Sequence, residues 1–142
     1  MSIENMDYEA KIIIPTQQLY QELSIQADEL FEQIKNSAID SCAQCSEAYD
    51  STLGNPYTKF LCNTAFDMLE YAILNDKFEK LALGSLLTGL GFGNSSTTLG
   101  HALSYVYSNE GIMHGHALAH TTTVAHKFNN SKFYEKISLK VM

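Results

Sequence analysis

The chain reads LALGSLLTGLGFGNSSTTLGHALSYVYSNEGIMHGHALAHTTTVAHKFN over residues 81–129, and this stretch contains all five histidines and seven of the eight glycines of the protein. Packing alone rarely concentrates the imidazoles of a short protein in so limited a segment. Imidazole is the commonest metal-binding side chain, and it titrates near neutral pH. The stretch therefore indicates a metal or catalytic site, or the remains of one.

Length and composition indicate a single globular domain. The chain has 142 residues, of which 45% are hydrophobic and 18% are charged. Its net charge of −7 argues against nucleic acid or an anionic membrane as partner, because both require a basic surface. We find no apolar run long enough to span a membrane and no signal-peptide pattern. The low, odd count of three cysteines favours a cytoplasmic location over a disulfide framework.

The segment before the histidine-rich stretch is predicted to be helical. Apolar residues recur at helical spacing from Leu19 to about residue 50, with Thr16 as N-cap. Asn36 and Ser37 mark either a kink in one helix or a break between two. Residues 1–15 are expected to form an extended N-terminal segment whose apolar residues 12–14 pack on this helix.

The remaining helices follow from start signals and periodicity. Asn55 before Pro56 predicts a helix start, because the missing N–H of proline does no harm at the first helical position. This helix is expected to end near Asn75. The next helix, over residues 78–90, is apolar on most sides and is therefore expected to be central. Shorter helices are predicted over residues 98–107, 114–127 and 132–139. No alternating strand pattern is present, so the predicted class is all-α with about five or six helices.

Several short motifs occur in an order that resembles one enzyme family. They are Glu47-Ala48-Tyr49, Asn55-Pro56, Gly84-Ser85-Leu86-Leu87, Gly91-Phe92-Gly93-Asn94, Gly100-His101-Ala102-Leu103 and Gly111-Ile112-Met113-His114-Gly115. Together they resemble the metal-binding helical domain of the iron-containing (group III) alcohol dehydrogenases, over about residues 38–129. The resemblance implies the C-terminal domain of the dehydroquinate synthase-like fold, present here in part over residues 16–142.

The resemblance also implies a metal site. In the family one aspartate and three histidines hold a divalent ion, and the matching positions here are Asp40, Gln44, His101 and His114. Gln44 stands where the family usually has histidine. The set suits Fe²⁺ first and accepts Zn²⁺ as an alternative. Tyr105 replaces a histidine that lines the family's catalytic pocket, and its phenol is a candidate acid or substrate-orienting group. Met113 replaces a proline.

The function implied by the resemblance is that of an NAD(P)-linked alcohol dehydrogenase or aldehyde reductase acting on a small alcohol or aldehyde. The family binds NAD(P) with a separate α/β domain, which we do not find in this sequence, so the 142-residue chain alone is expected to be inactive. The alternative is a non-catalytic helical module that binds a metal or another protein. Expected partners are a nucleotide-binding chain or a second copy, which would cover the leucines of residues 81–90.

Other residues have plainer interpretations. Cys42 and Cys45 form a C-x-x-C pattern inside a helix, where we expect packing rather than redox chemistry. The glycines of residues 89–93 fail the dinucleotide pattern at Asn94 and are expected to let helices approach closely. His116 and His120 are spaced as a possible second metal pair, without the glutamate of the HExxH motif. His126 is expected to face solvent. Without the resemblance, Asp40 and Gln44 would be interpreted as surface residues, and His101 as either a core histidine or a helix-start residue.

Overall fold

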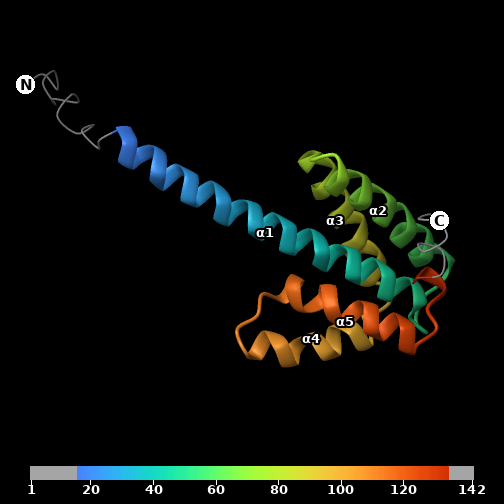
Figure 1. Ribbon diagram of the computed structural model, residues 1–142. Helices are drawn as coiled ribbons and strands as arrows, with labels where there is room; N and C mark the ends of the chain where they lie inside the picture. Colours follow the sequence, from blue (N-terminus) through green and yellow to red (C-terminus); the bar gives the residue numbers. More distant parts are fainter. Residues whose placement is uncertain (1–15, 135–142) are drawn as a thin grey trace, which may run out of the picture. The chain divides into compact units, whose positions relative to one another are not determined.

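The computed structural model of the protein describes residues 16–134 (Figure 1). Side chains are described from residue 29 onward. The structure contains no strand within residues 16–134, which confirms the all-α class. Its labelled helices are α1 (Thr16–Asp50), α2 (Pro56–Leu74), α3 (Phe78–Phe92), α4 (Leu99–Asn109) and α5 (His114–Phe128). The chain divides into residues 1–33 and residues 34–142, and every contact described below lies within the second unit.

The helix boundaries follow the predicted signals closely. α1 continues through Asn36 and Ser37 as one helix, so neither residue breaks it. Residues 132–134 begin the predicted last helix, whereas its remainder and the predicted segment 1–15 lie outside the described residues. None of the helices within residues 16–134 combines the length and the apolar character that crossing a bilayer requires.

Among α2 to α5, only α2 begins with a side-chain cap of its own. The Asn55 side chain accepts hydrogen bonds from the backbone N–H groups of Tyr57 and Thr58, at 3.0 and 3.1 Å. The Thr58 side chain returns the interaction by accepting from the Asn55 backbone N–H at 2.8 Å. This reciprocal pairing satisfies donors that every helix start leaves open. The Asn-Pro signal in the sequence is therefore confirmed.

The main core is built from small residues. The fully buried members of this core are Cys45, Ala48, Cys62, Ala65 and Leu69. Two glycines of α3 allow the close approach of the helices, since a Cβ added at Gly91 would lie 2.6 Å from Cys62 Sγ, and one at Gly84 would lie 2.8 Å from Leu69 Cγ.

The cysteines pack as expected. The Cys45 thiol lies 2.9 Å from Thr88 Oγ1, and all three cysteines are free thiols. Burial raises the pKa of the Cys42 thiol to about 12, so this thiol stays protonated and unreactive at neutral pH.

The prediction that α3 is central is wrong. Its buried residues are Gly84, Thr88 and Gly91, the small residues of one face. That face packs against α2, and within the described residues Leu86 on the opposite side is 60% exposed. The apolar composition of α3 therefore did not distinguish a helix that is buried on all sides from one that packs against its neighbours on a single face.

Because leucines of α3 are exposed, self-association of the chain remains a prediction. We expect light scattering to give a mass above the 15.8 kDa of one chain, because contiguous exposed apolar surface favours association. Leu86→Glu should lower that mass, whereas Val124→Glu, at an equally exposed site on α5, should leave it unchanged. A wild-type mass of one chain at high concentration would contradict the prediction.

Candidate metal centre

Four polar residues of α1 organise the site. Asn36, Asp40, Gln44 and Glu47 follow one another at spacings of four, four and three residues. Residues three and four apart lie on the same face of a helix, so these side chains form one polar stripe. We call them the α1 stripe. Asn36 and Glu47, at its two ends, bind the beginnings of other helices, and Asp40 and Gln44 lie between them.

Glu47 binds the beginning of α4. Its carboxylate is fully buried and accepts hydrogen bonds from the backbone N–H groups of Thr98 (3.0 Å), Gly100 and His101 (3.3 Å). Thr98, the N-cap residue of α4, makes no side-chain cap of its own, so a distant carboxylate satisfies these open donors. A negative charge at this end also complements the helix dipole. His101 is held in the first turn of α4 as a result.

Asn36 does the same for α5. Its side-chain oxygen accepts from the backbone N–H of His116 at 3.0 Å. Gly115 allows this approach, because a Cβ there would lie 2.7 Å from Asn36 Cα. His114, the first residue of α5, is thereby placed next to the α1 stripe.

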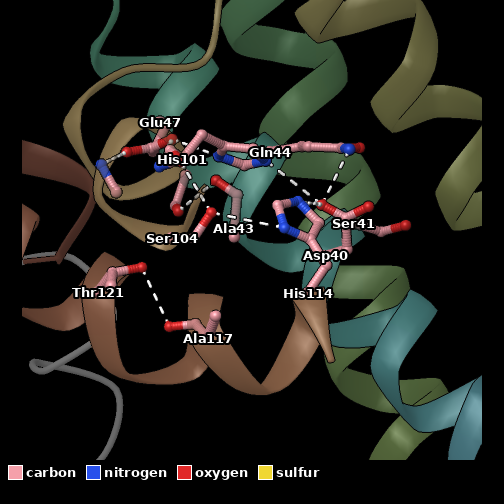
Figure 2. A network of polar contacts seen from close by, with 12 residues as sticks. Asp40, Ser41, Ala43, Gln44, Glu47, His101, Ser104, His114, Ala117 and Thr121 are labelled. Atoms are coloured by element: carbon pink, nitrogen blue, oxygen red, sulfur yellow. Dashed lines mark hydrogen bonds and ion pairs between the residues drawn. The ribbon is translucent and has the colours of Figure 1, made fainter. Parts of the chain in front are cut away.

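Asp40, His101 and His114 converge at this point (Figure 2). Asp40 Oδ1 lies 3.3 Å from His101 Nε2 and 3.8 Å from His114 Nε2. The ligand atoms of the three residues all lie within 4.8 Å of one another. No other group of three or more histidine, cysteine, aspartate or glutamate residues in the described part of the chain is arranged in this way.

The carboxylates dominate the electrostatics of the site. Burial disfavours the charged form of His101, but hydrogen bonds to Asp40 and Glu47 outweigh it and raise the pKa of this imidazole to about 9. Burial likewise opposes the charged form of Glu47, but hydrogen bonds from His101 and Thr98 lower the pKa of this carboxyl to about 2. The site therefore attracts positive charge, and a cation bound here would replace the proton on His101 Nε2.

These residues fit a divalent metal ion. One carboxylate and two imidazoles are the donor set of the facial triad that binds Fe²⁺ with open positions, and Zn²⁺ accepts the same donors. The Glu47 carboxylate lies 2.6 Å from His101 Nδ1, on the side of the ring away from Asp40. A carboxylate behind a histidine is the usual support of a metal-binding imidazole.

Gln44 lies beside this group. Its side-chain N–H donates to Asp40 Oδ1 at 3.0 Å, so the amide orients the carboxylate (Figure 2). Coordination of a metal by the Gln44 carbonyl stays a prediction.

Tyr105 lies at the open edge of the site. Its ring stacks on His114, with centroids 5.9 Å apart and planes 19° from parallel, and the residue is 58% exposed. The phenol is thus accessible from outside, as a group that contacts substrate must be. Its role as acid or orienting group stays a prediction.

Sequence reasoning gave no site role to Asn36 or Glu47. The available signal was their helical spacing from Asp40. The residues around them in the sequence do not indicate their partners, which lie 51 positions away for Glu47 and 80 positions away for Asn36. His116 and His120 are exposed and do not belong to the three-residue group.

The expectation that His126 faces solvent is wrong. It follows Leu118, Thr121 and Ala125 on the buried face of α5. Its Nε2 lies 2.8 Å from Ser46 Oγ, and its Nδ1 lies 3.9 Å from Asp50 Oδ2.

Protonation of His126 is expected to destabilise the fold. Burial lowers the pKa of His126 despite the nearby Asp50 and Glu47 carboxylates. The unfolded chain therefore binds a proton at His126 more readily than the folded protein does. The stability that the neutral imidazole contributes is lost as pH falls below the unfolded pKa of about 6.5. The glutamine in His126→Gln cannot titrate. Between pH 7 and 5.5 the free energy of unfolding, measured with urea, should therefore fall less in the variant than in wild type, by at most about 1.4 kcal/mol per pH unit. Equal losses in both proteins would contradict this.

The family model for the C-terminal part of the Fe-containing alcohol dehydrogenase family matches residues 34–140. The chain is also similar to the 4-hydroxybutyrate dehydrogenase of Clostridium kluyveri, with 32% identity over 92 residues, covering 57% of this chain and 25% of that protein. It thus spans about a quarter of that relative's length. No solved structure gives a significant match. The family match covers most of the chain, and the protein therefore belongs to the Fe-containing alcohol dehydrogenase family, whose C-terminal helical domain it carries.

Proposed function

We propose that this chain supplies the metal-binding helical domain of an NAD(P)-linked alcohol dehydrogenase or aldehyde reductase. Asp40, His101 and His114 hold one divalent cation, Fe²⁺ first and Zn²⁺ as an alternative. The observation that carries the proposal is the convergence of their three ligand atoms within 4.8 Å. Family membership supports the same chemistry.

The bound ion would polarise the oxygen of an alcohol or carbonyl substrate as a Lewis acid. The residues of the chain position that oxygen and shape the charge around it. The Asp40 carboxylate balances the charge of the cation, and Gln44 holds this carboxylate in place by donating to Oδ1. The exposed phenol of Tyr105 is available to donate a hydrogen bond to the substrate oxygen.

The proposed substrate is a short primary alcohol that carries a charged group, or the corresponding aldehyde. Support comes from the relative in Clostridium kluyveri, which is named for a hydroxy carboxylate, 4-hydroxybutyrate. We assign the nicotinamide to a nucleotide-binding domain outside the region matched here.

Metal content tests the site directly. After reconstitution with Fe²⁺ without oxygen, or with Zn²⁺, elemental analysis should give about one ion per wild-type chain. Asp40→Ala should reduce this to background. Glu79→Ala removes an equal charge from an exposed position at the start of α3 and should keep the ion. Equal metal content in wild type and Asp40→Ala would overturn the assignment.

NADH consumption with the aldehyde of 4-hydroxybutyrate tests whether the metal and the nicotinamide are bound by different domains. We expect metal binding without appreciable turnover by the 142-residue chain alone, because hydride transfer requires a nicotinamide held against the substrate carbon. Positioning of this kind contributes about 7–11 kcal/mol to catalysis. Steady turnover by this chain, lost on His114→Ala, would contradict the assignment of the nicotinamide to another domain.

A further inference from the structure

Both oxygens of the buried Glu47 carboxylate accept hydrogen bonds from groups inside the protein. Oε1 accepts from the Gly100 backbone and, at 3.0 Å, from Thr98 Oγ1. Oε2 accepts from the backbone N–H groups of Thr98 and His101, at 3.0 and 3.3 Å, and lies 2.6 Å from His101 Nδ1. One buried side chain therefore contacts both the backbone of the first turn of α4 and an imidazole of the candidate metal centre.

We infer that Glu47 is a positioning residue for the metal centre, which fixes the ring of His101 with its proton on Nδ1 and its Nε2 facing Asp40. An ionised carboxylate is only an acceptor, so the nitrogen beside it must carry the hydrogen. The opposite nitrogen, Nε2, faces Asp40 and is then the one that binds a metal, which displaces the proton held there in the metal-free protein. The inference rests on the proposed metal site, and it adds a residue that contacts neither the ion nor the substrate.

The backbone contacts give this support its rigidity. The same carboxylate accepts hydrogen bonds from the backbone N–H groups of the N-cap residue of α4 and of two residues in its first turn. The His101 ring therefore cannot turn without disturbing the beginning of its own helix. Gly100 makes the arrangement possible, since a Cβ there would lie 2.6 Å from Glu47 Oε1 and 3.0 Å from Thr122 Cα. The imidazole is thus oriented by the fold itself, before any ion arrives.

The competing explanation is that Glu47 only caps α4 and has no influence on the metal site. The substitution Glu47→Gln distinguishes the two explanations. The amide keeps the size of the side chain, but it is uncharged, and one of its two ends is a donor facing other donors. Two measurements apply: the affinity for Zn²⁺ at fixed pH, and the ¹⁵N–¹H signal of His101 Nδ1–H in the metal-free protein. Asn55→Ala is the matched control, because it removes the cap of α2 and touches no histidine.

We expect Glu47→Gln to weaken Zn²⁺ binding about 10–100-fold and to shift or abolish the Nδ1–H signal. Asn55→Ala should lower stability and change neither measurement. Wild-type affinity together with an unchanged Nδ1–H signal in Glu47→Gln would overturn the inference and reduce Glu47 to a helix cap.

Two further outcomes are informative. If Glu47→Gln does not fold, Gly100→Ala displaces the carboxylate without removing a polar group and should give the same two changes. Unchanged affinity and signal in that variant would count against the inference. If wild type itself binds no Zn²⁺, the proposed metal site fails, and the Nδ1–H signal still decides whether Glu47 positions the ring.

Discussion

Gly115→Ala is expected to lower the free energy of unfolding by about 3 kcal/mol, at the upper end of the usual cost of overpacking. The new methyl group would meet backbone atoms of Asn36, including Cα at 2.7 Å. Backbone cannot turn aside as a flexible side chain can, so α5 must move away from α1. This movement would also break the hydrogen bond from His116 N–H to Asn36 and displace His114 from Asp40. Urea unfolding and Zn²⁺ titration measure the two effects.

Gly89→Ala is the matched control. A Cβ at Gly89 meets nothing within 4 Å, and this glycine lies inside α3. The same substitution should therefore stabilise the protein by about 0.5–1 kcal/mol, because alanine is the better helix former. Similar changes in stability for Gly89→Ala and Gly115→Ala would show that the close approach of α1 and α5 is not a constraint.

Leu69→Ala is expected to cost about 2–5 kcal/mol, the range found for removing a large aliphatic side chain from a packed core. Leu69 is fully buried in the main core, and the backbone of α3 lies directly against it at Gly84. The space left behind cannot close unless α3 moves. Thermal or urea unfolding measures the loss.

Leu74→Ala provides the comparison for this prediction. Leu74 is the last residue of α2 and is 76% exposed, so its replacement should change the free energy of unfolding by no more than about 0.5 kcal/mol. If the two variants unfold at the same urea concentration, the core does not lie where the packing indicates.

The sequence was sufficient to predict features that depend on local signals or on motif order. The start of α2 was readable because Asn55 and Pro56 carry the signal in adjacent positions. Asp40, His101 and His114 were identified because they occur in a family order, and the structure brings them together. Periodicity gave the helices within a few residues of their observed ends.

The features that escaped prediction depend on contacts between distant parts of the chain. Glu47 reads locally as an ordinary helical glutamate, and only the fold brings Thr98 to it. His126 lies close to the polar end of α5, where exposure is common, but the helix turns it toward Ser46. The exposure of Leu86 depends on which side of α3 has a neighbour, and an apolar sequence does not specify this.

The register of the α1 stripe limits how this gene can vary in length. A single codon inserted between Asn36 and Glu47 would rotate one part of the stripe by about 100° relative to the other. Because Asn36 holds the beginning of α5 and Glu47 holds that of α4, the two helix starts would then be directed to different sides of α1. The loop between α4 and α5 contains no member of the stripe, and a residue added there leaves the register intact. Insertions and deletions should therefore be tolerated in that loop and excluded from residues 36–47.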